Sequence, residues 1–140
     1  MSTVADATLA GGGLVQGVIP RRLLDREVGK REVDNLVVTG TMAERKDRMI
    51  ADSDAFVSLA GGLGTLDELL EVMTLRQLGY LDKPILLVDT DGYWQPFMRL
   101  VEQVVGEGFA ERDSFGLAEL APTADEALER VAALVAVGTR

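Results

Sequence analysis

Residues 58–68 read S-L-A-G-G-L-G-T-L-D-E, a glycine-rich turn that joins an apolar run to a helical pattern. The run before it, Ala55–Leu59, predicts a buried strand. After the turn, apolar side chains recur at the spacing of one helix face: Leu66, Leu69, Leu70 and Met73. This spacing predicts a helix over Thr65–Gly79. A strand that leads through such a turn into a helix is the basic unit of α/β folds.

The rest of the chain repeats this alternation. Apolar runs predict four further strands: Val15–Ile19, Leu36–Thr39, Ile85–Val88 and Leu117–Leu120. Helical patterns predict four further helices: Thr3–Ala10, Thr41–Asp52, Tyr93–Glu107 and Ala124–Val137. Near-continuous apolar runs are typical of parallel strands that are buried on both faces. We therefore expect an α/β fold with a Rossmann-like, doubly wound parallel sheet, in a single domain over residues 1–140.

Helix starts and helix faces follow from the same patterns. Three Thr-x-x-Glu segments fit the capping box, in which the threonine and glutamate side chains bond the free N–H groups: Thr41/Glu44, Thr65/Glu68 and Thr123/Glu126. On the last helix we expect four side chains to face inward: Leu128, Val131, Leu134 and Val135. The stripe that contains Trp94, Phe97 and Met98 is expected to be core, with a dimer face as the alternative.

Composition limits the chemistry. The chain has 14 Lys plus Arg and 23 Asp plus Glu, hence a net charge of −9, which argues against a nucleic-acid or membrane surface. It has no cysteine and no histidine, which excludes disulfides, thiol nucleophiles, Cys-based zinc sites and histidine catalysis. No apolar run approaches the roughly 18 residues of a membrane span, and no signal-peptide pattern opens the chain. We expect a cytoplasmic protein.

The glycine turn is a candidate phosphate site. Its glycines permit positive φ and close approach of a ligand, and the helix behind it offers unpaired N–H groups and a positive dipole end. It is neither a Walker A loop nor a dinucleotide-binding G-x-G-x-x-G. By spacing alone, the glycines could equally make only a tight turn, with Glu68 completing only the capping box.

Several segments in order make the pattern specific. The nonapeptide A-G-G-L-G-T-L-D-E at 60–68 resembles the P-G-G-x-G-T-x-x-E signature of the LOG family, the cytokinin riboside 5′-monophosphate phosphoribohydrolases, which are often labelled lysine decarboxylases. G-V-I-P at 17–20, M-A-E-R-K at 42–46, T-L-R-Q-L-G at 74–79 and D-G-Y-W at 91–94 resemble other segments of that family. Ala60 and Ala43 depart from it, since the family has proline and histidine there.

The front of the chain also departs from the family. From this resemblance we expect the family's first βαβ segment, on the order of 30 or more residues, to be missing here. Without it, Leu36–Thr39 or Ala55–Leu59 would carry an exposed apolar edge. We therefore expect the isolated chain to be marginally stable, or to pair that edge with another chain.

The resemblance implies hydrolysis of the N-glycosidic bond of a nucleoside 5′-monophosphate, with release of the free base and ribose 5-phosphate. It assigns catalysis to Arg45 and Glu68. It assigns substrate and phosphate binding to the following residues: Glu27, Lys46, Gly61, Gly62, Leu63, Gly64, Thr65 and Thr74. Thr74 would line the pocket from the side of a partner subunit, so a homodimer is implied. No metal or cofactor is implied, because a carboxylate can stabilise an oxocarbenium-like transition state and activate water.

Other interpretations stay open at this point. The protein could be a nucleotide-binding module that has lost turnover. The charged run 44–48 could be a solvated helix face, and Glu27 could form a surface ion pair with Arg26. Asp89 and Asp91 fit a turn better than a metal site. A pyridoxal phosphate decarboxylase is rejected, because neither Lys46 nor Lys83 lies in a Schiff-base setting.

Overall fold

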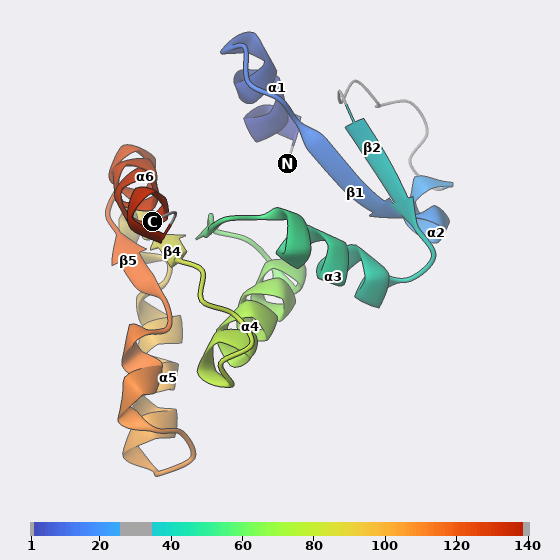
Figure 1. The fold of residues 1–140 in the computed structure, drawn as a ribbon. Helices are drawn as coiled ribbons and strands as arrows, with labels where there is room; N and C mark the ends of the chain where they lie inside the picture. The colour runs from blue at the N-terminus through green and yellow to red at the C-terminus, as the bar shows by residue number, and fades with distance from the viewer. Residues whose placement is uncertain (1, 26–34, 139–140) are drawn as a thin grey trace. The chain divides into compact units, whose positions relative to one another are not determined.

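The structure is a computed structural model that describes residues 2–25 and 35–138. The chain divides into two compact units, Met1–Asp52 and Ser53–Arg140, and each is described by itself (Figure 1). All strand pairs in both units are parallel among the described residues, so the predicted α/β class with parallel strands is confirmed.

The first unit is built on a pair of strands. Its elements are α1 (Ser2–Ala10), β1 (Gln16–Pro20), α2 (Arg21–Leu24), β2 (Asn35–Thr39) and α3 (Met42–Asp52). The strands pair in register from Gln16 opposite Asn35 to Pro20 opposite Thr39. The Gln16 amide donates to Asp52 Oδ2 at 2.8 Å, which ties the end of α3 to the start of β1. The short α2 was not predicted.

Side-chain caps set the start of α3. The Glu44 N–H donates to Thr41 Oγ1 at 3.1 Å, as the capping box requires. In return, Glu44 Oε2 accepts from the Gly40 N–H at 2.7 Å, one residue before the expected position. The cap of α6 is simpler, because the Glu126 N–H bonds Thr123 Oγ1 while the Glu126 carboxylate pairs with Arg130.

The second unit holds a three-stranded sheet in the order β3-β4-β5. Its elements are β3 (Phe56–Ser58), α4 (Leu63–Gln77), β4 (Ile85–Val88), the 3-10 turn η1 (Thr90–Gly92), α5 (Gln95–Gly106), the 3-10 turn η2 (Arg112–Gly116), β5 (Glu119–Ala121) and α6 (Ala124–Gly138). All five predicted strands and all five predicted helices are present, with ends shifted by a few residues.

The core of the second unit surrounds β4. All four side chains of this strand are buried, as expected for a central parallel strand. Leu69, Val72 and Met73 of α4 are buried too, and so is Trp94, whose ring makes edge contacts with Tyr93 and Phe97. The prediction that this aromatic stripe is core is thus confirmed for Trp94, while Phe97 and Met98 are partly buried.

The inward face of α6 agrees with the prediction at Val131 and Val135, which are partly buried, but not at its two leucines. Leu128 is 59% exposed and Leu134 is 42% exposed. Ala127 is completely buried instead, in a cluster with Leu86 and Val88 of β4 against which Val131 packs. The small Ala127 side chain at the contact lets the helix lie close to the sheet. The buried stripe is therefore centred on Ala127, one residue before Leu128.

Among the described residues, no helix has the length and apolar character needed to cross a membrane. β3 is an edge strand of its three-stranded sheet, and Val57 is partly exposed there. The single domain, the absent first segment and the marginal stability expected from it stay predictions.

Candidate functional site

The glycine turn lies between β3 and α4. The helix begins at Leu63, two residues earlier than expected, with Gly62 at the N-cap in an extended conformation (φ −90°, ψ −160°). Thr65 therefore lies inside the first turn, and the predicted Thr65/Glu68 capping box is wrong. The first N–H groups of a helix have no intrahelical acceptor, so those at Leu63, Gly64 and Thr65 suit an anion.

Of the two purposes expected for the glycines of this turn, positive φ is wrong for all of them. The described glycines with positive φ are Gly12, Gly79, Gly92 and Gly108, and none belongs to the turn. Gly61 is needed because a Cβ there would lie 2.2 Å from Thr65 Oγ1 and 2.9 Å from Thr65 Cβ. A Cβ at Gly62 or Gly64 would meet nothing within 4 Å, so this side of the turn leaves room for a ligand.

A tyrosine from the next βα connection supports the turn. The Tyr93 hydroxyl donates a hydrogen bond to the Gly61 carbonyl oxygen. Sequence reasoning missed this residue as part of the site, although D-G-Y-W had been noted as one of the resembling segments. Tyr93 and Gly61 are 32 positions apart, and no local pattern relates them.

The connection before Tyr93 is a tight turn. Asp89 accepts from the Trp94 N–H at 2.7 Å and from Gln95 Nε2 at 2.5 Å. Asp91 (φ 54°) and Gly92 (φ 72°) both have left-handed backbone. The interpretation of Asp89 and Asp91 as turn residues is confirmed. Within residues 2–25 and 35–138, no three acidic side chains gather closely enough to hold a metal ion.

Glu68 lies on α4 in the same unit as the glycine turn. It follows Thr65 by three positions, so both side chains project from the same side of the helix. Glu68 is partly buried. The structure therefore places Glu68 on α4 three residues after the glycine turn 61–65, and Tyr93 contacts the same turn at Gly61.

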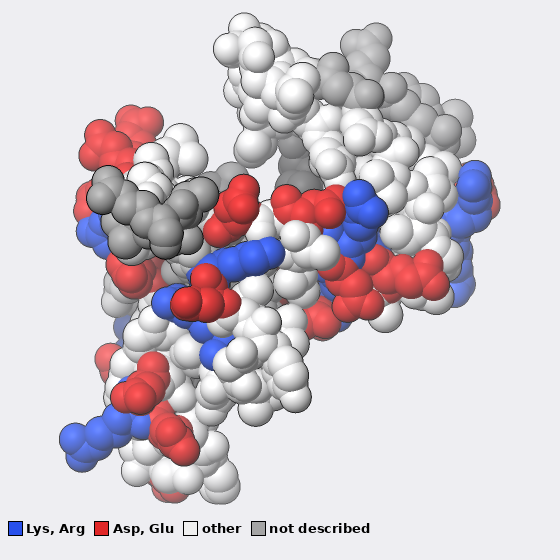
Figure 2. All heavy atoms as spheres, in the orientation of Figure 1, with Lys and Arg blue, Asp and Glu red and all other residues white. Residues whose placement is uncertain are grey.

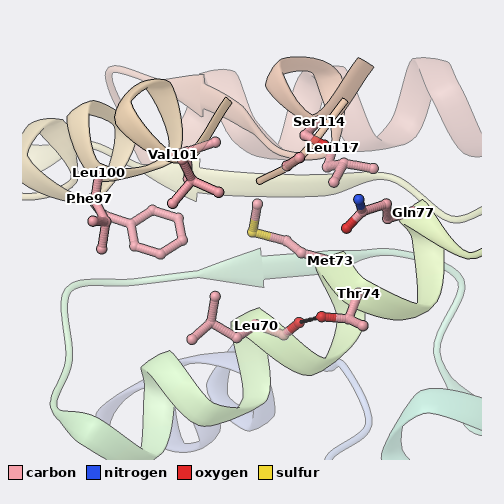
Figure 3. Close-up of a pocket in the computed structure, with 11 residues that line it drawn as sticks. Leu70, Met73, Thr74, Gln77, Phe97, Leu100, Val101, Ser114 and Leu117 are labelled. Atoms are coloured by element: carbon pink, nitrogen blue, oxygen red, sulfur yellow. Dashed lines mark hydrogen bonds between the residues drawn. The ribbon is translucent and has the colours of Figure 1, made fainter. Parts of the chain in front are cut away.

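Thr74 lies elsewhere. It follows Thr65 by nine positions, which is about 13 Å along the helix axis, and its hydroxyl donates to the Leu70 carbonyl at 2.7 Å. Within one chain it is not brought to the glycine turn. It lines an apolar pocket of about 160 Å³ between α4, α5 and η2 (Figure 3).

This pocket is open and mostly hydrophobic. Figure 3 shows Met73, Phe97, Val101 and Leu117 turned toward its interior from α4, α5 and the η2 end. Leu70, Leu100 and Val104, which also line it, are large apolar side chains that remain exposed. The second unit thus presents an apolar face over α4 and α5.

Arg45 and Lys46 lie in the first unit, on α3, and both are partly buried. Arg45 Nε donates to the Val18 carbonyl of β1 at 3.0 Å, so this side chain turns back over the strand. The alternative of a solvated helix face describes Arg48 better, since it forms an exposed ion pair with Asp52 at 2.6 Å. Figure 2 shows acidic and basic side chains next to one another over α3.

The predicted site residues thus fall in both units. Arg45 and Lys46 belong to the first, while Glu68, the glycine turn and Thr74 belong to the second. Glu27 lies outside the described residues. That these side chains act at one site stays a prediction.

Comparison with known proteins gives a consistent result. A family model described as "Possible lysine decarboxylase" matches residues 1–131. The chain is 41% identical over 131 residues to the probable cytokinin riboside 5′-monophosphate phosphoribohydrolase LOGL1 of Oryza sativa subsp. japonica, which covers 94% of this chain and 59% of that protein.

Two further relatives carry the same activity in their names. The phosphoribohydrolase LOG of Oryza sativa subsp. japonica is 44% identical over 126 residues, or 90% of this chain and 52% of that protein. The Arabidopsis thaliana enzyme LOG4 is 40% identical over 131 residues, or 94% of this chain and 61% of that protein. The chain therefore spans between about half and three-fifths of the length of these relatives.

Proposed function

We propose, because this chain belongs to the family described as possible lysine decarboxylases that includes the LOG phosphoribohydrolases, that it hydrolyses the N-glycosidic bond of a nucleoside 5′-monophosphate. The substrate is a cytokinin riboside 5′-monophosphate or an AMP-like nucleotide, and the products are the free base and ribose 5-phosphate. The observation that carries the proposal is the cluster at the end of β3, where Glu68 stands beside a turn with unpaired helical N–H groups.

The turn would hold the 5′-phosphate. The N–H groups of Gly61, Gly62, Leu63, Gly64 and Thr65 are the donors, and the positive end of the α4 dipole adds to their attraction. The open space beside Gly62 and Gly64 supports this role, because a phosphate oxygen must come close to the backbone there.

Glu68 would act on the ribose. Cleavage of the glycosidic bond develops positive charge on the sugar ring, and a carboxylate beside the ring stabilises that charge. The same carboxylate can take a proton from the attacking water. This chemistry requires neither histidine nor cysteine, and the chain contains neither.

The first unit would contribute the cations. Arg45 can hold phosphate or ribose oxygens with its planar guanidinium while its Nε bonds Val18, and Lys46 adds a point charge. Glu27 would contact the substrate. Arg45 and Glu68 would act on the same substrate.

The test compares Glu68→Gln with the wild type on AMP and isopentenyladenosine monophosphate, with the released base measured by chromatography. We expect the variant to bind both nucleotides and to release no base. Asp67→Asn is the matched control, because Asp67 is the neighbouring exposed carboxylate on α4. This variant should retain full turnover. A wild type that binds nucleotide but releases no base would refute hydrolysis and would favour a binding module without turnover.

We also propose that the protein works as a homodimer whose second copy covers the apolar face over α4 and α5. The exposure of Leu70, Leu100 and Val104 supports this, because a contiguous apolar patch of this kind is typical of an interaction surface. Thr74 lies in the same face, so pairing through it would carry Thr74 toward the partner's site. Leu100→Glu should convert the dimer to a monomer in light scattering, whereas Leu128→Glu on α6 should not; a monomeric wild type would refute the dimer.

The cytoplasmic location stays a prediction.

A further inference from the structure

We propose that Tyr93 is a positioning residue for the phosphate-binding turn, an inference that rests on the proposed function. Its hydroxyl donates to the Gly61 carbonyl oxygen, and this bond sets the direction of the N–H groups that meet the phosphate. Three observations carry the inference: the geometry of the Gly61 peptide, the packing of Thr65 on Gly61, and the rigidity of the corner that holds Tyr93.

The first observation concerns one peptide plane. The Gly61 carbonyl and the Gly62 N–H belong to the same peptide group, which is planar and trans. In a trans peptide the C=O and N–H bonds point in opposite directions. When Tyr93 holds the Gly61 oxygen, it therefore fixes the Gly62 N–H so that it points away from the tyrosine. Gly62 is the N-cap of α4, where the anion-binding donors begin.

The second observation is that Gly61 is held from two directions. The Thr65 side chain lies against the Gly61 Cα, so closely that a Cβ there would overlap Oγ1. The Tyr93 hydroxyl bonds the adjoining carbonyl. A glycine without such contacts explores a wide range of φ and ψ, and a loop built on it loses that freedom only when a ligand binds. Here the contacts remove part of this freedom before the ligand arrives.

The third observation is that Tyr93 stands on a fixed corner. Asp89 accepts hydrogen bonds from the Trp94 N–H and from the Gln95 amide, and the Asp89 N–H bonds the Ala121 carbonyl of β5 at 2.8 Å. Trp94, the next residue, is 1% exposed and anchors the start of α5 in the core. The backbone at Tyr93 is thus tied to the sheet and the core, and its ring, which is 45% exposed, makes an edge contact with Trp94.

The experiment uses Tyr93→Phe, which removes the hydroxyl and keeps the ring that contacts Trp94. The chain has two tyrosines, and Tyr80 is 80% exposed, so Tyr80→Phe is a matched control for the loss of one hydroxyl. Calorimetry measures the dissociation constants of AMP, adenosine and inorganic phosphate for both variants and the wild type. Trp94 fluorescence in urea checks that each variant is folded.

We expect Tyr93→Phe to raise the dissociation constants of AMP and inorganic phosphate by about five- to tenfold, the loss that corresponds to one hydrogen bond. The dissociation constant of adenosine should not change. Tyr80→Phe should match the wild type with all three ligands. In steady-state kinetics, Tyr93→Phe should have a raised KM for the monophosphate and a nearly unchanged kcat.

Three results would overturn the inference. Equal losses for AMP and adenosine would mean that Tyr93 supports the fold in general and does not orient the phosphate donors. Unchanged phosphate affinity in Tyr93→Phe, or no phosphate or AMP binding by the wild type, would equally refute it. A wild type that binds AMP without releasing base would refute only the hydrolysis, and the comparison of AMP with adenosine would still decide the role of Tyr93.

Discussion

Substitution of Gly61 by alanine tests the reason that the structure gives for the first glycine of the turn. The new Cβ would lie 2.2 Å from Thr65 Oγ1 and 2.9 Å from Thr65 Cβ. Rotation of the threonine side chain can move the oxygen away. It cannot move the Cβ, which is fixed to the backbone of α4. The backbone of the turn must therefore shift.

The expected cost follows from two terms. Overpacking that forces a backbone shift costs about 1–3 kcal/mol. The shift also draws the Gly61 carbonyl away from the Tyr93 hydroxyl, and the loss of that bond adds about 1 kcal/mol. We therefore expect Gly61→Ala to lower the free energy of unfolding of the second unit by about 2–4 kcal/mol.

Gly64→Ala is the control in the same turn. A Cβ at this position meets nothing within 4 Å, and the residue is helical, so alanine should stabilise the unit by about 0.4–1 kcal/mol. Combination of Gly61→Ala with Thr65→Gly, which removes the atoms in conflict, should recover part of the loss in a double-mutant cycle.

Urea unfolding monitored by tryptophan fluorescence measures all of these variants, because Trp94 is the single tryptophan and is buried in the second unit. Equal stability of Gly61→Ala and wild type would refute the steric argument. An equal loss of unfolding free energy in Gly64→Ala would also refute it, because no atom conflicts with a Cβ at that position.

Three further predictions follow from other contacts. Thr41→Ala removes the acceptor of the Glu44 N–H and should destabilise α3 by about 1 kcal/mol, seen as faster amide hydrogen exchange in that helix; unchanged exchange would contradict the cap. Asp89→Ala removes the acceptor of two hydrogen bonds and should lower the unfolding free energy by about 1–3 kcal/mol in the Trp94 assay; a wild-type urea midpoint would argue against a fixed corner. Arg45→Lys loses the Nε donor to Val18 and should lower kcat/KM by about 30- to 150-fold, whereas the exposed Arg48→Lys should not; equal effects would contradict the assignment of Arg45.

The elements of the fold were readable from the sequence because they depend on local patterns. The apolar run Ile85–Val88 predicted a strand buried on both faces, and its four side chains are buried. The helix faces were read less well. On α6 the pattern predicts that Leu128 faces inward, because such a pattern is recognised from large apolar side chains, whereas the structure buries Ala127. Close packing of a helix on a sheet can require the smaller residue, and that depends on the distance between the two elements, which the sequence does not contain.

The site divides in the same way. The glycine turn and Glu68 could be located from a single segment of sequence, because a strand, a turn and a helix follow one another along the chain. The start of α4 was misplaced, since Thr-x-x-Glu is found in capping boxes and also, as here, inside a helix that begins two residues earlier. Tyr93 was missed because its contact with Gly61 depends on the parallel pairing of β3 and β4, which brings the ends of both strands to one edge.

The glycines at positions 61, 62 and 64 show that residues of one sequence motif can have different structural roles. The sequence pattern predicts two purposes for all of them, positive φ and close approach of a ligand, and none of them has positive φ. Gly61 is constrained by its own chain, through Thr65 and Tyr93, whereas Gly62 and Gly64 face open space. If a phosphate fills that space, alanine at Gly64 should stabilise the fold and lower the affinity for phosphate. Alanine at Gly61 should lower both the stability and the affinity. Measurement of stability and phosphate affinity on the same two variants therefore separates a glycine kept for the fold from a glycine kept for the substrate.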